Sequence, residues 1–168
     1  MDVKFGKNTA HLACEKLRAD VRDYGSISRL VRKRDAFVHL AAVSRVEWGQ
    51  TQPVRCLEVN TIGTLNLLGA IRKRNPDALV ILTSSREVYG EPSSFPVREA
   101  DPKCPISVYG ASKLAAENLL RSYGLTYGLK HVILRFSNVY GSPRDLPQRV
   151  IPKFMKRAVQ GKTLEVYG

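Results

Sequence analysis

The 168-residue sequence is poor in acidic side chains, aromatic residues and cysteine. Only 15 Asp and Glu stand against 27 Lys and Arg, and the net charge of +12 favours anionic partners such as phosphates, nucleic acids or acidic lipids. The 3 cysteines are too few and too widely spaced for a disulfide framework or a metal cluster, so we expect no metal site and a reducing compartment. No run reaches the roughly 20 apolar residues of a membrane span, and no signal-peptide core occurs near the start. We therefore expect a soluble, cytoplasmic protein that needs no membrane.

The excess of basic residues does not by itself indicate a nucleic-acid-binding protein. Basic residues are scattered, apart from the segments 32–34 and 144–162. No zinc-finger spacing, RNP-type aromatic motif or long basic helix occurs, so a nucleic-acid module would rest on charge alone. Most charged runs of this kind are solvated surfaces. We keep nucleic-acid binding as a weak alternative and expect no specific nucleic-acid partner.

The composition is 43% hydrophobic, enough for a folded core, and three short apolar runs predict buried strands at 36–42, 78–83 and 131–136. Apolar residues recur at helical spacing between these runs. They are Val54, Leu57, Leu65, Leu68 and Ile71 in the first interval and Ala111, Leu114, Ala115 and Leu119 in the second. Alternating strands and helices of this length predict an α/β fold with a parallel sheet. Upstream, we expect a short strand at 17–21 and a short helix capped by Ser26.

Candidate catalytic side chains lie where the predicted strands end, which is where open parallel sheets bind ligands. Ser85 closes the second strand region, and Tyr109 and Lys113 lie one turn apart at the start of the second helix. The pKa of a free phenol is about 10, and a neighbouring ammonium lowers it, so this pair can move a proton. Alone, the Tyr-x-x-x-Lys spacing is a weak signal, because both residues are common on exposed helix faces.

Five sequence blocks follow one another along the chain. They are HLAAVSRV (39–46), VNTIGTLNLL (59–68), SSREVYG (84–90), YGASK (109–113) and LRFSNVYG (134–141). Together they resemble the extended branch of the short-chain dehydrogenase/reductase superfamily, the NAD-dependent nucleotide-sugar epimerases and dehydratases. The resemblance implies a partial Rossmann-type doubly wound parallel sheet flanked by helices, NAD as cofactor and a nucleotide sugar as substrate.

The resemblance also implies a role for each matching residue. Tyr109 is expected to be the acid/base, Ser85 to bind the same sugar hydroxyl, and Lys113 to lower the Tyr109 pKa and hold the nicotinamide ribose. The other implied positions are Asp20 and Val21 beside the adenine, Leu40, Ala41 and Ala42 near the pyrophosphate, Asn60 supporting the cofactor site, and Asn138 and Arg149 near the substrate phosphates. Each has a structural alternative: a turn acid for Asp20, close packing for the alanines, a packing amide for Asn60, a cap for Asn138 and a solvated surface for Arg149.

The implied reaction is epimerisation of the UDP-glucose 4-epimerase type, through a transient 4-keto sugar. Tyr109 removes the hydroxyl proton while hydride passes to NAD, and hydride then returns to the other face of the sugar. A 4,6-dehydratase or decarboxylase of the same family remains an alternative, because Glu87 is able to act as an additional acid/base. Arg86 stays protonated and cannot. A loop carboxylate paired with Arg86 is an equally good interpretation of Glu87.

The family's glycine-rich strand-turn-helix, which holds the cofactor pyrophosphate, has no counterpart in this sequence. Residues 1–13 are too few for such a unit, which needs roughly 30 residues. We expect an irregular segment at 1–16, a partial NAD(P)-binding Rossmann-type domain at 17–142, and the start of a truncated substrate-binding region at 143–168. Weak or absent activity is therefore expected, and a non-catalytic α/β interaction module is the alternative. The resemblance also implies a homodimer formed through the Tyr–Lys helix, with residues 111–120 at the interface.

Overall fold

The computed structural model describes residues 13–141, 145 and 147–166. Contacts divide these residues into two units, of which the first ends at Ser137 and the second begins at Asn138. The predicted domain boundary at 142/143 and most of the predicted irregular segment 1–16 lie outside the described residues. The candidate catalytic residues all belong to the first unit.

Three strands form a parallel sheet in the order β1-β2-β3. They are β1 (Ala36–His39), β2 (Leu79–Ser85) and β3 (His131–Phe136). In the register, His39 lies beside Leu82, and Ser85 lies beside Phe136. The predicted α/β class and parallel sheet are confirmed. β2 runs two residues beyond the expected end, so both Ser84 and Ser85 belong to the strand.

The first strand is shorter than the apolar run 36–42 predicts, because side chains take over its backbone hydrogen bonds. The Thr83 hydroxyl donates to the His39 carbonyl at 2.8 Å. Asn60 then binds Val43 at both its N–H and its carbonyl, at 2.7 and 3.1 Å. Residues 40–42 therefore leave the sheet while remaining at its carboxyl edge.

The first predicted helix is three consecutive segments: α3 (Pro53–Leu57), the π-helical η1 (Glu58–Ile62) and α4 (Gly63–Arg74). Single π turns inside α-helices are frequent at functional sites. A Cβ at Gly63 would lie 2.5 Å from Val21 Cγ2, so this close approach requires glycine. The preceding helix α2 (Val46–Thr51) was not predicted, because its 6 residues are too short to show a helical period.

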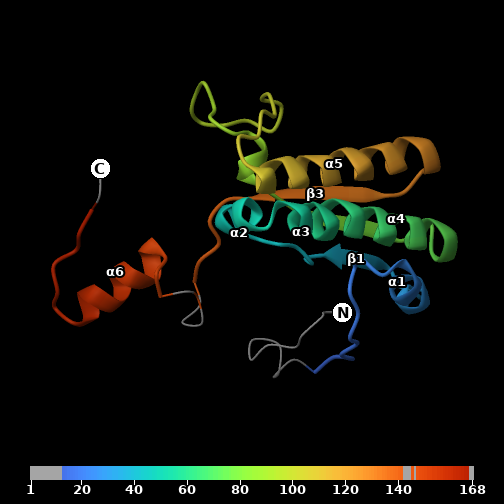
Figure 1. Ribbon diagram of the computed structural model, residues 1–168, viewed down its shortest axis with the longest axis horizontal. Coiled ribbons are helices and arrows are strands. Elements are labelled where there is room, and N and C mark those ends of the chain that lie inside the picture. Colours follow the sequence, from blue (N-terminus) through green and yellow to red (C-terminus); the bar gives the residue numbers. More distant parts are fainter. Residues whose placement is uncertain (1–12, 142–144, 146, 167–168) are drawn as a thin grey trace. The chain divides into compact units, whose positions relative to one another are not determined.

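The second predicted helix is α5 (Val108–Tyr127). Ser107 caps it by accepting the Gly110 N–H at 3.0 Å, and Gly128 ends it with φ at 71°. The short 3-10 helix η2 (Arg86–Val88) follows β2 directly. Figure 1 shows α4 and α5 side by side over the sheet. Their N-terminal halves therefore lie near the carboxyl ends of the strands.

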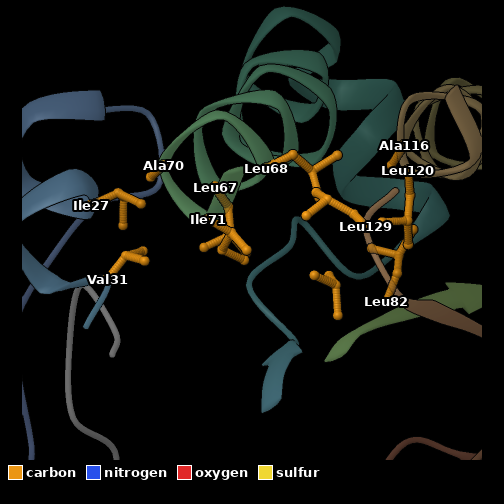
Figure 2. Close-up of a cluster of buried hydrophobic side chains, with 11 residues drawn as sticks. Ile27, Val31, Leu67, Leu68, Ala70, Ile71, Leu82, Ala116, Leu120 and Leu129 are labelled. Atoms are coloured by element: carbon orange, nitrogen blue, oxygen red, sulfur yellow. The ribbon is translucent and has the colours of Figure 1, made fainter. Parts of the chain in front are cut away.

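The hydrophobic core fills the space between these helices and the sheet (Figure 2). Its buried members are Ile27, Val31, Leu67, Leu68, Ala70, Ile71, Val80, Leu82, Ala116, Leu120 and Leu129. Burial of a valine, leucine or isoleucine side chain stabilises a fold by roughly 1.5–3 kcal/mol. The core therefore fixes α4, α5 and β2 relative to one another, and with them the candidate site.

Two predictions for the start of the first unit are wrong. Segment 17–21 forms no strand, and Arg18 alone makes an isolated bridge. A turn in which the Asp23 N–H donates to the Asp20 carbonyl at 3.1 Å follows instead. Asp23, not Ser26, caps α1 (Tyr24–Leu30), because its carboxylate accepts the Ser26 N–H from the first turn at 3.2 Å.

The second unit contains α6 (Val150–Val159), which was not predicted as a helix. Val150, Met155 and Val159 are exposed on it, and Lys156 and Arg157 occupy its last turn. Among the described residues, no helix is long and apolar enough to cross a bilayer.

Candidate active site

Ser85 lies at the carboxyl end of β2 and is only 8% exposed. Its hydroxyl accepts the Glu87 N–H at 3.2 Å and so caps η2. The η2 turn then packs tightly on the first turn of α5, where a Cβ at Gly110 would lie 2.5 Å from the Glu87 carbonyl oxygen. Because η2 follows Ser85 directly, this contact between η2 and α5 places Ser85 near the first turn of the Tyr–Lys helix.

Tyr109 is the second residue of α5, and the Ser85 side chain lies close enough to influence its pKa. Burial raises the pKa of the Tyr109 phenol, the nearby Ser85 hydroxyl lowers it by less, and the charge of Glu87 raises the pKa further. The net direction is opposite to the lowering expected from Lys113. The reason is physical: a phenolate in a buried site loses the solvation that stabilises it in water.

Lys113 lies one turn after Tyr109 and is 5% exposed. Burial lowers its pKa to about 8, against the opposing influence of Cys56 and Glu117. Within the described part of the chain, no group makes a hydrogen bond or ion pair with the Lys113 ammonium. A largely buried lysine whose ammonium has no protein partner is typical of a side chain that meets a ligand.

Asn60, in the π-helical turn, connects the end of β1 to α5. Besides holding Val43, its amide donates to Ser112 Oγ at 2.8 Å, and that hydroxyl donates to the Tyr109 carbonyl at 2.7 Å. The structure therefore gives Asn60 the packing role that was its alternative, and its cofactor role stays a prediction. It positions the loop 40–43 against the helix that bears Tyr109.

His39 extends this hydrogen-bonded chain under the site. Its Nε2 lies 3.0 Å from Thr64 Oγ1, which donates its own proton to the Asn60 carbonyl at 2.6 Å. His39 Nε2 must therefore carry a hydrogen and act as the donor. Burial, aided by the charge of Lys113, lowers the His39 pKa to about 4. The ring is neutral at physiological pH.

Glu87 pairs with Arg86 as its structural interpretation expects, and its acid/base role stays a prediction. Its carboxylate lies 3.2 Å from the Arg86 guanidinium, as the pairing interpretation expects. It is also near enough to Tyr109 to raise the phenol's pKa. The structure thus brings Glu87 to the same site as Ser85, Tyr109 and Lys113.

The residues expected around the cofactor's adenine and pyrophosphate are more exposed. Asp20 pairs with Arg22 at 2.7 Å in the turn before α1, which is the turn role considered as its alternative. Val21 packs against Gly63. Beyond β1, Leu40 is 69% exposed, and the two alanines that follow it are half-buried. The cofactor-binding roles of Asp20, Val21, Leu40, Ala41 and Ala42 stay predictions.

The expected substrate contacts Asn138 and Arg149 belong to the second unit. Arg149 pairs with Asp145 at 3.2 Å and donates to the Val139 carbonyl at 3.2 Å. Their substrate-binding roles stay predictions.

Sequence reasoning missed several polar residues packed beneath the site, namely His39, Thr64, Ser112, Glu117 and Arg135. One signal was available. Glu117 follows Lys113 by four residues, so it lies on the same helix face, inside an otherwise apolar stripe. A carboxylate in such a position needs a buried partner.

Comparisons with known proteins decide the family. The family model described as "NAD dependent epimerase/dehydratase family" matches residues 3–168. The chain belongs to this family. It is 35% identical over 162 residues to a UDP-glucose 4-epimerase of Lacticaseibacillus casei, covering 90% of this chain and 49% of the relative. It is also 35% identical over 154 residues to a dTDP-glucose 4,6-dehydratase of Streptomyces antibioticus, covering 90% of this chain and 45% of the relative.

Solved structures of epimerase/dehydratase family proteins agree with the fold. A UDP-N-acetylglucosamine 4-epimerase from Methanobrevibacter ruminantium superposes with a TM-score of 0.80 at 32% identity, covering 90% of this chain and 49% of that one. A UDP-glucose 4-epimerase from Brucella ovis in complex with NAD gives a TM-score of 0.77 at 32% identity, covering 90% and 50%. The chain thus spans about half the length of the relatives it matches.

Proposed function

We propose that this chain carries the acid/base half of an NAD-dependent nucleotide-sugar epimerase site of the UDP-glucose 4-epimerase type. The observation that carries the proposal is Lys113, a largely buried lysine whose ammonium has no partner among the described residues, one turn from the Tyr109 phenol that Ser85 approaches. No core-forming role accounts for an ammonium in that position. A ligand with hydroxyl acceptors does account for it.

The residues present fit the ribose and nicotinamide end of NAD. Lys113 offers three N–H donors, which suit a ribose diol. The loop 40–42, held by Asn60, and the turn at Asp20 and Val21 would lie along the rest of the cofactor. When bound, NAD supplies the hydride acceptor and donor. The family's NAD dependence and the NAD complex of a 32%-identical epimerase support this cofactor.

Tyr109 and Ser85 handle the proton of the sugar hydroxyl. The raised pKa keeps the Tyr109 phenol protonated at neutral pH, ready to donate. Acceptance of a proton requires the phenolate, which the burial of Tyr109 opposes and which a charged Lys113 one turn away would favour. Ser85 holds the hydroxyl in line with the phenol. The predicted contacts of Asn138 and Arg149 with the substrate phosphates complete the proposal.

A second candidate is a 4,6-dehydratase or decarboxylase of the same family. Glu87 favours it, because this carboxylate stands close to Tyr109 and supplies the additional acid/base that such chemistry requires. The 35% identity to a dTDP-glucose 4,6-dehydratase gives the same support that the epimerase relatives give the first candidate.

We propose a homodimer formed by the outer faces of α3, α4 and α5. Val54, Leu57 and Leu65 are exposed at near-helical spacing along α3 and α4, an apolar stripe of the kind that helix pairs bury. Of the residues expected at the interface on α5, Ala111 and Asn118 are exposed. Size-exclusion chromatography with light scattering tests this, and Leu65→Glu should yield monomers if the stripe is the interface.

We also propose a cytoplasmic location. All three cysteines, at positions 14, 56 and 104, are free thiols. Free thiols are typical of a reducing compartment. Fractionation of the native cells with an antibody against the chain tests this.

Hydride transfer is the experiment that tests the proposed activity. The purified chain is supplied with NAD and UDP-glucose, and NADH is followed by absorbance. Slow formation of transient NADH is expected from the wild-type chain and none from Tyr109→Phe, which retains the ring but loses the proton. Product analysis separates epimer from 4-keto-6-deoxy sugar. If the purified chain releases no NAD on denaturation and binds none when NAD is added, the non-catalytic interaction module is favoured. If a DNA titration shows tight binding at physiological salt, the nucleic-acid alternative is favoured.

A further inference from the structure

Glu117 is a fully buried carboxylate on α5 that the proposed reaction does not use. Its side chain is 0% exposed, and it lies one turn beyond Lys113 on the same face of the helix. Burial of a carboxylate is unfavourable unless its oxygens are fully paired. Its partners therefore show what it holds in place.

Two elements of the sheet supply those partners. Arg135 of β3 makes a two-pronged contact, with Nε 2.9 Å from Oε1 and Nη2 2.7 Å from Oε2. Ser84 of β2 donates its hydroxyl to Oε1 at 2.5 Å. Two-pronged arginine–carboxylate pairs fix geometry as well as charge. Glu117 thus holds the residue next to Ser85.

Arg135 continues the contact into the segment 86–107, which links Ser85 to Tyr109. Its Nη1 donates to the Tyr89 hydroxyl at 2.6 Å and to the Glu99 carbonyl at 3.0 Å. Its guanidinium also lies 4.9 Å from the Tyr89 ring centroid. The ion pair therefore ties down the linking segment at two points.

We propose that the Glu117–Arg135 ion pair is a positioning device for the candidate active site. It fixes the segment 86–107 and the end of β2 against α5, and it places a negative charge one turn from the Lys113 ammonium. The proposal rests on the proposed function for its purpose, since Ser85, Tyr109 and Lys113 are the groups being positioned.

The charge around Lys113 is well defined by the elements packed near it. Glu117 comes from α5, Cys56 from α3 and His39 from β1. His39 is neutral at physiological pH. Glu87 and Glu117 are both carboxylates of this site, and Glu117 is the one whose charge raises the Lys113 pKa and so opposes the loss of its proton.

The charge effect is tested by NMR titration of the full chain carrying ¹³Cε-labelled lysine, with the Lys113 signal assigned through Lys113→Arg. Glu117→Gln keeps the shape of the side chain but removes its charge. The Lys113 pKa, about 8 in the wild-type chain, should fall by about one further unit. Leu120→Ala is the matched control, because it weakens the same helix without changing charge and should leave this pKa unchanged.

The anchoring effect is tested by limited trypsin digestion of the segment 86–107, which contains Arg98 and Lys103. Arg135→Gln should speed cleavage there by about tenfold, because both anchors of the segment are lost. Arg121→Gln is the control, since Arg121 lies 3.6 Å from the same carboxylate but its side chain is 47% exposed. It should leave the cleavage rate unchanged.

A neutral pair, Glu117→Gln with Arg135→Met, covers the case in which single variants fail to fold. This double variant should fold. Its Lys113 pKa should be as low as in Glu117→Gln, and trypsin should cleave its segment 86–107 as fast as in Arg135→Gln. An unchanged Lys113 pKa, an unchanged cleavage rate, or failure of the neutral pair to fold would each overturn the proposal. Neither measurement needs NAD or a sugar, so this proposal and the proposed activity can fail independently.

Discussion

Asn60 holds Val43 by both its backbone N–H and its carbonyl, at 2.7 and 3.1 Å, as a neighbouring strand would. The two residues come from the π-helical turn and from the loop that follows β1. The same amide reaches Ser112 on α5. The buried Asn60 side chain therefore takes the place of a neighbouring strand at the end of β1 and joins the loop after β1 to the Tyr–Lys helix.

Replacement of Asn60 by alanine should destabilise the fold by about 2–4 kcal/mol, because Val43 and Ser112 would lose buried hydrogen bonds. Urea unfolding followed by circular dichroism measures the change. Asn66→Ala is the matched control, since Asn66 lies on the same helix and donates to the Val21 and Arg22 carbonyls nearer the surface. Equal losses in the two variants would contradict the special role of Asn60.

Lys113→Met should stabilise the fold at pH 7. The Lys113 pKa of about 8 lies below its ordinary value of 10.5, so the folded state opposes the charge. That difference corresponds to about 3 kcal/mol, present below pH 8 and relieved as the pH rises to 10.5. Unfolding at pH 7 and pH 10.5 checks this. A variant less stable than the wild-type chain at pH 7 would show that Lys113 serves the fold.

The wild-type chain should lose stability between pH 6.5 and pH 4 through His39. Its folded pKa of about 4 lies below the ordinary 6.5, so the unfolded chain takes up the proton first as the pH falls. The loss reaches about 3 kcal/mol by pH 4. Thermal unfolding across this range measures it, with His39→Gln as the reference. Parallel curves for the two proteins would show that His39 is not the group responsible.

Gly110→Ala should separate η2 from α5, because the new Cβ would meet the Glu87 carbonyl oxygen at 2.5 Å. We expect a destabilisation of about 1–3 kcal/mol and loss of the Ser85–Tyr109 contact. Gly69→Ala on α4 is the control: its Cβ meets nothing closer than 3.6 Å, so it should be neutral or stabilising by up to about 1 kcal/mol. Equal stability of the two variants in calorimetry would argue against the close approach.

The apolar runs and helical stripes were sufficient to predict the α/β class, the three strands and the two long helices. The end of β1, the helix α2 and the cap of α1 were not predicted correctly, each because of contacts or lengths that sequence periodicity does not reveal. β1 ends at His39 because Thr83 and Asn60 compete for backbone groups, which no periodicity reveals. The helix α2 is shorter than two turns. Asp23 displaced Ser26 as the cap, since both are good capping residues and only the chain path distinguishes them.

The site was predictable where it depended on spacing along one helix. Tyr109 and Lys113 share a face because they are one turn apart, and Ser85 lies near Tyr109 because β2 ends beside the first turn of α5. The raised Tyr109 pKa was not predictable, because it depends on how deeply the phenol is buried. Arg135 was hidden for a similar reason: its position in an apolar run gave no sign that it reaches Glu117 across the sheet.

Saturation-transfer NMR of NAD with the 168-residue chain tests the central assignment most directly, because it detects weak binding. Saturation should pass most strongly to the nicotinamide-ribose protons. Lys113→Met should weaken binding by about tenfold or more, the usual cost of losing charge-assisted hydrogen bonds. Equal transfer to the wild-type chain and to Lys113→Met, or no transfer to either, would contradict the assignment of this buried lysine as the ribose-binding group.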